Sequence, residues 1–346
     1  MRTVPSNGRR KGSTRVTLND VARQVGTSTI TVSRALRRPD MVSEKLRTRI
    51  AAAVAELGYL PDPAARTLAS RRSDVIGVLV PSITNSVFSD VLTGLYDTVA
   101  ETPFSVQLGN TRYQASVEEE LIGIFLSQRP AGLIVAGIDQ SLRSRALLER
   151  ADCPVVQIME TAPDPVDMIV GFSHSDAARA ATEHLLAQGY RAPAFLGARM
   201  DPRSERRRTG FRQALIETGL SWQGREVVTP EPSSVRLGGE LFERQRASAP
   251  ETDAVFCNND DLALGAQFAA LRAGLRVGPE FGICGFNDLE VMASAFPTIT
   301  SIRTHRRTMG ETSAKIIIDR LSGVKAANSV IDLKWSLVAR DSTRRI

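Results

Sequence analysis

The sequence has 346 residues, of which 42% are hydrophobic and 24% charged, so it is long enough for two or three domains and too apolar to be disordered throughout. No run of about 18 uncharged apolar residues occurs, and no apolar stretch follows the basic N-terminus, so we expect neither a transmembrane helix nor a secretory signal. Three widely spaced cysteines, Cys153, Cys257 and Cys284, predict buried reduced thiols in a cytoplasmic protein without a metal site or other cofactor.

The net charge of +6 is unevenly distributed along the chain. Residues 1–75 carry 15 of the 44 basic and 6 of the 38 acidic side chains, which leaves 29 basic and 32 acidic side chains for the rest. A basic head on a slightly acidic body predicts that the head binds a polyanion. We expect nucleic acid rather than a membrane surface, because the head lacks the apolar face of an interfacial helix.

Residues 1–14 form a Gly-, Ser- and Arg-rich tail that we predict to be disordered. The apolar residues between Leu18 and Val25 then share one face of a helix, which Gly26 ends. Ser28 can cap a second helix, and two short helices joined by a glycine turn are typical of a helix-turn-helix. The inward positions of the second helix are Val32, Ala35 and Leu36.

A third helix follows, because Ser43 can cap it and Gly58 can end it. Three short helices with apolar inner faces make a compact DNA-binding domain, which we place at residues 15–60. Two prolines then break the chain, and the amphipathic run behind them is too short to be a stable isolated helix. We therefore expect a linker at residues 61–73 that becomes helical when it binds a partner.

From Val75 onward, apolar strands alternate with segments of helical spacing. This alternation predicts an α/β fold class, with parallel sheets covered by helices on both faces, and the length favours two subdomains. The expected strands are Val75–Val80, Phe104–Leu108, Gly132–Val135, Val155–Met159, Met168–Phe172, Pro193–Gly197, Ala254–Cys257 and Gly282–Gly285. The expected helices include Val117–Leu126, Ala177–Leu186, Gly210–Thr218 and Leu262–Ala273. The Pro-rich stretch 161–165 is the expected crossover between the subdomains.

The start of the second helix carries short polar side chains, as a helix that reads the DNA major groove requires. Ile30 points outward there, which contact with a thymine methyl group explains better than folding does. Arg34 can bind guanine or a phosphate. The alternative is that the hydroxyl residues only cap a solvated helix. The candidate DNA-contacting residues of the head are Thr17, Ser28, Thr29, Ile30, Thr31, Ser33 and Arg34.

Three runs resemble the lactose/galactose-repressor family of bacterial transcription factors: VTLNDVARQVGTSTITVSRAL at 16–36, ELGYLP at 56–61 and AARTLA at 64–69. The resemblance implies that the linker is a hinge helix that folds on the operator, where Ala65 contacts DNA and Leu68 wedges into the minor groove. Asp62 departs from the asparagine that is usual in the family, which should weaken or reposition a phosphate contact. Thr29 and Ile30 match the two positions that vary with operator sequence.

The body shows no catalytic pattern, because its three histidines lie in no nucleophile or metal motif and no Gly-rich phosphate loop is present. Polar residues instead follow several expected strands, the place where parallel α/β sheets bind ligands. Asp260 and Asp288 could equally be simple helix caps. Arg199, Arg203 and Arg207 suit a carboxylate ligand, although this arginine-rich run could also be the solvated start of a helix.

The body also resembles periplasmic sugar-binding proteins, which implies an effector between two subdomains. The implied subdomains are about 74–161 with 290–323, and about 162–289 with 324–346. Within the family, residues 170–172, 196–203 and 256–263 look closest to the gluconate-utilisation repressors. The candidate effector-binding residues, from the resemblance and from the strand ends together, are Ser82, Asn85, Phe88, Glu160, Phe172, Arg199, Arg203, Arg207, Ser233, Asn259 and Asn287.

These observations predict a cytoplasmic, homodimeric repressor that binds a pseudo-palindromic operator and responds to a sugar acid such as gluconate or a ketogluconate. Three alternatives remain open at this point. The same class of regulator could respond to a neutral sugar or a purine. The chain could be a cytosolic sugar-acid binding protein, or a sugar-acid enzyme with a DNA-binding head, although the missing catalytic residues argue against an enzyme.

Overall fold

The computed structural model describes residues 16–37, 39–60, 72–324 and 328–345. The chain divides into two compact units, a head that ends at Arg71 and a body that begins at Arg72. The predicted tail and the predicted hinge as far as Arg71, including Asp62, Ala65 and Leu68, lie outside the described residues.

The described part of the head is a helix-turn-helix domain, as predicted. Its elements are α1 (Leu18–Val25), α2 (Thr29–Arg37), the 3-10 turn η1 (Pro39–Met41) and α3 (Glu44–Leu57). Gly26 ends α1 in the left-handed conformation, with φ of 68°. Val21, Val32 and Ile50, one from each helix, are at most 1% exposed and form the centre of the core. Leu36 differs from the prediction, because it is 41% exposed and the buried stripe of α2 ends at Ala35.

The described part of the body contains two six-stranded sheets, which confirms the α/β prediction. The strands of the first sheet are β1 (Val75–Val80), β2 (Ser105–Asn110), β3 (Gly132–Ala136), β4 (Val155–Ile158), β5 (Met168–Gly171) and β11 (Val330–Asp332). Those of the second sheet are β6 (Pro193–Ala198), β7 (Glu226–Thr229), β8 (Ala254–Cys257), β9 (Gly282–Asn287), β10 (Thr300–Thr304) and β12 (Trp335–Val338). Their orders are β11-β5-β4-β3-β1-β2 and β12-β10-β9-β8-β6-β7, and among these pairs β10–β12 alone is antiparallel.

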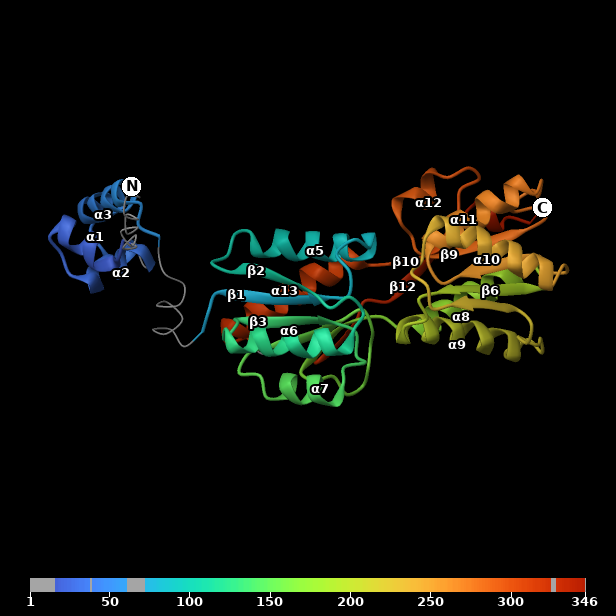
Figure 1. Cartoon of the computed structure of the whole chain (residues 1–346), viewed down its shortest axis with the longest axis horizontal. Helices are drawn as coiled ribbons and strands as arrows, with labels where there is room; N and C mark the ends of the chain where they lie inside the picture. The colour runs from blue at the N-terminus through green and yellow to red at the C-terminus, as the bar shows by residue number, and fades with distance from the viewer. Residues whose placement is uncertain (1–15, 38, 61–71, 325–327, 346) are drawn as a thin grey trace, which may run out of the picture. The chain divides into compact units, whose positions relative to one another are not determined.

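Helices cover both faces of each sheet (Figure 1). Those of the first half are α5 (Ser86–Val99), α6 (Ala115–Ser127), α7 (Leu142–Glu149) and α13 (Arg306–Leu321). Those of the second half are α8 (His174–Ala187), α9 (Pro202–Glu217), α10 (Val235–Ser248), α11 (Asp260–Arg272) and α12 (Glu290–Ser294), followed near the C-terminus by η2 (Asp341–Thr343). In β1, Ile76 and Val78 share a core with α5 and α13, whereas Leu79 shares one with α6 and α7. Burial on both faces explains why β1 is a continuous apolar run.

The chain passes between the two halves of the body at three places, and these differ from the predicted boundaries. β5 follows the expected crossover at 161–165 but pairs with β4 in the first sheet. β10 lies within 290–323 but pairs with β9 in the second sheet. β11 pairs with β5, so the last passage lies between β11 and β12. Three of the strands that the sequence did not predict, β7, β11 and β12, are short edge strands without a long apolar run.

None of the helices in the described ranges combines the length and the apolar character that a membrane span requires.

The helices α5 and α13 pack closely against each other through two glycines. A Cβ atom on Gly310 would collide with the carbonyl oxygen of Val91, and one on Gly94 would collide with that of Arg307. The backbones of the two helices therefore touch where larger residues would hold them apart.

Replacing Gly310 by Ala should lower the free energy of unfolding by about 1–3 kcal/mol, the usual cost of overpacking a close contact. The matched control is Gly123→Ala in α6, where a Cβ atom meets nothing within 4 Å. That change should leave the free energy of unfolding unchanged or raise it by up to about 1 kcal/mol. Urea unfolding of both variants measures the difference, and equal effects would contradict the close approach of α5 and α13.

Candidate functional site

The exposed face of α2 gathers the residues that the sequence assigned to DNA contact. Ile30 lies in the first turn of α2 and is 68% exposed, whereas Val32, two residues further along, is fully buried. Arg34, one turn further along, is exposed as well. Thr29 and Ser33 are partly exposed beside them. This side of α2 therefore offers an apolar and a cationic contact to a partner outside the head.

Three of the predicted hydroxyl contacts also have roles inside the head. The Ser28 hydroxyl accepts a hydrogen bond from the Thr31 N–H at 3.1 Å, and the two side-chain oxygens lie 2.8 Å apart. The Thr17 hydroxyl donates to Asp20 at 2.7 Å. These contacts give Thr17, Ser28 and Thr31 structural roles at the starts of α1 and α2, and their contact with DNA stays a prediction. The capping interpretation does not account for Ile30, which gains nothing from folding at this position.

A cavity of about 50 Å³ lies in the body where strands of both sheets end. Both halves of the body line it, with α5 and the segment after β2 on one side and α9 with the segment before it on the other. Of the predicted effector-binding residues, eight line this cavity: Asn85, Phe88, Arg199, Arg203, Arg207, Ser233, Asn259 and Asn287.

Backbone strain is concentrated around this cavity. Eight non-glycine residues of the described chain have a φ in the left-handed region, and half of them line the cavity: Tyr113, Met159, Arg199 and Asn287. Such conformations cost about 1–3 kcal/mol each and persist where the surrounding structure holds them. Their concentration here is typical of a binding site.

Arg207 is the central charge of the cavity and is 8% exposed. Its guanidinium lies 3.8 Å from the ring centroid of Phe286, and it donates hydrogen bonds to Nδ1 of His174 at 3.0 Å and to the carbonyl oxygen of Asn258. Burial lowers the pKa of Arg207 to about 10, so it stays cationic at neutral pH. Among the described residues, no carboxylate lies within ion-pair distance of it. A buried cation held by neutral groups can accept an anionic ligand.

His174 fixes the orientation of Arg207. Its Nδ1 accepts the hydrogen bond from Arg207, and its Nε2 lies 2.7 Å from the carbonyl oxygen of Met159. Only the neutral ring with a proton on Nε2 satisfies both contacts. Burial and the neighbouring Arg207 cation hold the pKa of His174 well below its ordinary value, which agrees with the neutral form. His174 therefore holds Arg207 in place, and its neutral ring is not poised to act as a general acid.

The other two predicted arginines have protein partners. Arg203 forms an ion pair with Asp201 at 2.9 Å, and Arg199 lies over the ring of Tyr113 at 4.1 Å from its centroid. By contrast, the side-chain oxygen Oδ1 of the neutral Asn287 is buried and accepts no hydrogen bond from the described residues. A ligand hydroxyl would satisfy this oxygen.

Three predicted residues do not line the cavity: Ser82 supports a residue that does, whereas Phe172 and Glu160 contact residues outside its lining. Phe172 is fully buried and packs on His174, with ring centroids 4.4 Å apart. The Ser82 hydroxyl accepts from the Asn85 N–H at 3.2 Å and shapes the turn before α5. Glu160 is 3% exposed and lies 3.5 Å from Nε of Arg206. Each follows a strand end, as predicted; Phe172 and Glu160 are buried, whereas Ser82 is partly exposed.

The sequence missed Tyr113, Asp201 and Ser204, which also line the cavity. Tyr113 follows the carboxyl end of β2, the place where parallel sheets bind ligands. Asp201 caps α9 by accepting from the Ser204 N–H at 2.9 Å, while its other oxygen holds Arg203. The sequence DPRS at 201–204 carries the signal of a capped helix start, from which these two residues could have been found.

The neutral state of His174 predicts a pH dependence of stability. Because the pKa of His174 is lowered by folding, the unfolded chain binds a proton below its ordinary pKa of about 6.5, whereas the folded chain does not. The free energy of unfolding should therefore fall as the pH drops below 6.5, with a contribution from His174 of up to about 1.4 kcal/mol per pH unit. Above pH 6.5 this contribution disappears.

Urea unfolding of the wild type and of His174→Gln between pH 5 and pH 8 isolates this contribution. The raised pKa values of Glu160 and Asp260, which are due to burial, act in the opposite direction and are common to both proteins. The difference in unfolding free energy between the two proteins should shrink as the pH falls. A constant difference over the whole range would contradict a neutral, buried His174.

Two family descriptions match the chain. "Bacterial regulatory proteins, lacI family" matches residues 17–62, and "Periplasmic binding proteins and sugar binding domain of LacI family" matches residues 73–337. The chain is 42% identical over 329 residues to the HTH-type transcriptional regulator GntR of Pseudomonas aeruginosa, and the match covers 95% of this chain and 96% of that one.

Two solved structures are similar over most of the chain. A LacI-family transcriptional regulator from Silicibacter pomeroyi has a TM-score of 0.89 and 34% identity, over 95% of this chain and all of that one. The Lac repressor dimer bound to operator and the anti-inducer ONPF has a TM-score of 0.82 and 29% identity, over 95% and 99% of the two chains. The protein therefore belongs to the LacI family of bacterial transcriptional regulators.

Proposed function

We propose that this DNA-binding regulator is a homodimeric repressor that a sugar acid, such as gluconate or a ketogluconate, releases from its operator. The observation that carries the proposal is the buried Arg207 guanidinium, which faces the cavity without a carboxylate partner among the described residues. A guanidinium binds a carboxylate through two parallel hydrogen bonds, so an acid would complete its charge pairing. The free side-chain oxygen of Asn287 would accept a hydrogen bond from a hydroxyl of the same ligand.

The effector would act by favouring one arrangement of the two halves of the body. Arg207 belongs to the second half, whereas Asn85 and Phe88 belong to the first, so a ligand in the cavity contacts both. Arg206 of the second half already pairs with Asp139 of the first half, at 2.6 and 2.8 Å. A ligand that binds one arrangement better shifts the population toward it, with a coupling free energy of about 1–3 kcal/mol.

In the dimer that we propose, each head occupies one half-site of a pseudo-palindromic operator. The structure of the Lac repressor dimer on its operator supports this arrangement, because that protein is similar to this chain.

The protein would act in the cytoplasm, where the bacterial chromosome lies, and would catalyse no reaction. His174 is engaged with Arg207 and Met159, and the described residues contain no group of three or more His, Cys, Asp or Glu side chains placed to hold a metal ion.

The first test is release of operator DNA by a panel of ligands. The operator is selected from a random duplex pool, and its affinity is then measured with gluconate, 2-ketogluconate, galactonate, glucose, ribose and adenine. We expect the acids alone to weaken binding, by about fivefold or more. The same acids at 100 times their Kd should stabilise the protein by about 2.7 kcal/mol. A response to the neutral sugars or to adenine, without one to the acids, would contradict a sugar-acid effector.

Arg207→Met should abolish the response to the acids while operator affinity stays near that of the wild type, because it removes the charge and keeps much of the volume. The matched control is Arg208→Met on the same helix, whose guanidinium pairs with Glu226 at 2.9 Å and does not line the cavity. Thermal unfolding of each variant with and without gluconate gives the comparison. An Arg207→Met protein that gluconate still stabilises would rule out Arg207 as the anion site.

Ile30→Ala should weaken binding to the selected operator by about 1–3 kcal/mol and relax the preference for one thymine-containing base pair. The slope of affinity against salt should not change, because that slope reports phosphate contacts. The control is Leu36→Ala, which removes another exposed apolar side chain from the same helix. Repeating the selection with both variants shows which base pair is affected. An unchanged preference in the Ile30→Ala pool would contradict a base contact at this position.

A further inference from the structure

A second cavity, of about 230 Å³, lies directly beside the one that contains Arg207. It is enclosed by the ends of β1, β2 and β3, by the start of α6 and by the start of α9. Tyr113, Asp201 and Arg203 line both cavities, so the two spaces share a wall. The Arg207 cavity has a volume of only about 50 Å³, so most of the room for a ligand lies on the far side of this wall.

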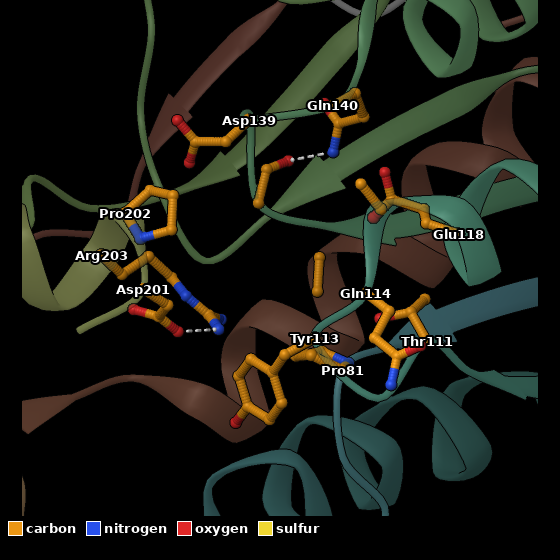
Figure 2. A pocket seen from close by; sticks show the side chains of 13 residues that line it. Pro81, Thr111, Tyr113, Gln114, Glu118, Asp139, Gln140, Asp201, Pro202 and Arg203 are labelled. Carbon is orange, nitrogen blue, oxygen red and sulfur yellow. Dashed lines mark hydrogen bonds and ion pairs between the residues drawn. The ribbon is translucent and has the colours of Figure 1, made fainter. Parts of the chain in front are cut away.

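The two cavities differ in charge. Arginines dominate the smaller cavity, whereas the larger one is lined by three acidic side chains, Glu118, Asp139 and Asp201, and by one arginine. Figure 2 shows Glu118 and Gln114 across the larger cavity from Asp201 and Arg203. A ligand carboxylate would be attracted to Arg207 rather than to the acidic cavity, which fixes the direction in which an acid with a polar tail can bind.

Four of the eight polar side chains that line the larger cavity have hydrogen-bond or ion-pair partners among the described residues. Asp139 accepts two hydrogen bonds from Arg206, and Asp201 holds Arg203 and the start of α9. Gln140 donates to the carbonyl oxygen of Gly137 at 3.0 Å and accepts from Gln157 at 2.8 Å. Glu118 is the one acidic side chain of this cavity whose carboxyl group forms no hydrogen bond or ion pair with a described residue.

Glu118 is partly buried in α6. Burial, together with the nearby carboxylates of Asp139 and Glu119, raises the pKa of Glu118 to about 7. A carboxyl group of this kind can accept a hydrogen bond from one hydroxyl and donate to another at neutral pH. It is therefore suited to a polyhydroxylated chain, which offers adjacent hydroxyls that both donate and accept.

We propose that the larger cavity is the subsite for the hydroxylated tail of the effector, and that Glu118 selects acids by the length of that tail. This inference rests on the proposed function, because it takes the carboxylate to lie at Arg207. A ligand that occupies both cavities would pass Tyr113, Asp201 and Arg203, which line both of them. Short hydroxy acids would fill the Arg207 cavity alone, whereas six-carbon acids would reach Glu118.

The test is a chain-length series measured by titration calorimetry on the full-length protein. The probes are D-erythronate, with four carbons, and D-gluconate, with six. We expect Glu118→Ala to weaken gluconate binding about tenfold and to leave erythronate binding unchanged, since the loss of one hydrogen bond to a carboxyl group is worth about that much. Glu118→Gln keeps a donor and an acceptor and should restore most of the gluconate affinity.

The matched control is Glu120→Gln, which alters an exposed acid two residues further along α6 and should change neither affinity. Because Glu118 has no partner among the described residues, its variants should fold as the wild type does, and their thermal unfolding without ligand checks this. Equal effects of Glu118→Ala on the two acids, or no effect on gluconate, would overturn the tail subsite while leaving the proposed function intact. A wild-type protein that binds neither these two acids nor 2-ketogluconate and galactonate would instead overturn the proposed function itself.

Discussion

The burial of one guanidinium organises much of the body around it. Arg207 sits where the strands of the second sheet end, and it is held by a neutral histidine, a backbone carbonyl and the face of an aromatic ring. None of these partners neutralises its charge. The protein therefore keeps a cation in a poorly solvated place, which costs free energy unless an anion joins it. The buried positions of His174 and Phe172 behind it follow from this need, because each holds Arg207 or its support in place.

The elements of the fold that could be predicted from the sequence are those that consist of continuous apolar runs. The expected strands Val75–Val80 and Ala254–Cys257 have the same bounds in the structure, because a strand buried on both faces leaves an unbroken apolar signal. The short edge strand at Val330–Asp332 leaves no such signal, since it pairs on one side only. That strand decides where the chain makes its last crossing between the halves, and so the predicted boundary at residue 323 was displaced.

The candidate site was predictable in its location and only partly in its contacts. Strand ends in parallel sheets converge whatever their sequence, so Asn259 and Asn287 could be placed at one cavity from their positions alone. The direction of a side chain within a loop depends on local dihedral angles, which the sequence does not display. Glu160 and Tyr113 both follow strands, yet Glu160 turns toward Arg206 while Tyr113, with φ of 60°, faces the cavity.

The three passages of the chain between the halves have a consequence for synthesis on the ribosome. The head has a core of its own, so it can fold as soon as its helices emerge. The first sheet, in contrast, gains its last strand only at residues 330–332 and the second sheet only at residues 335–338. A chain that is cut short before these strands keeps its DNA-contacting helix but completes neither sheet. Truncation near the carboxyl terminus therefore separates the capacity to contact DNA from its control by a ligand, because the two depend on opposite ends of the gene.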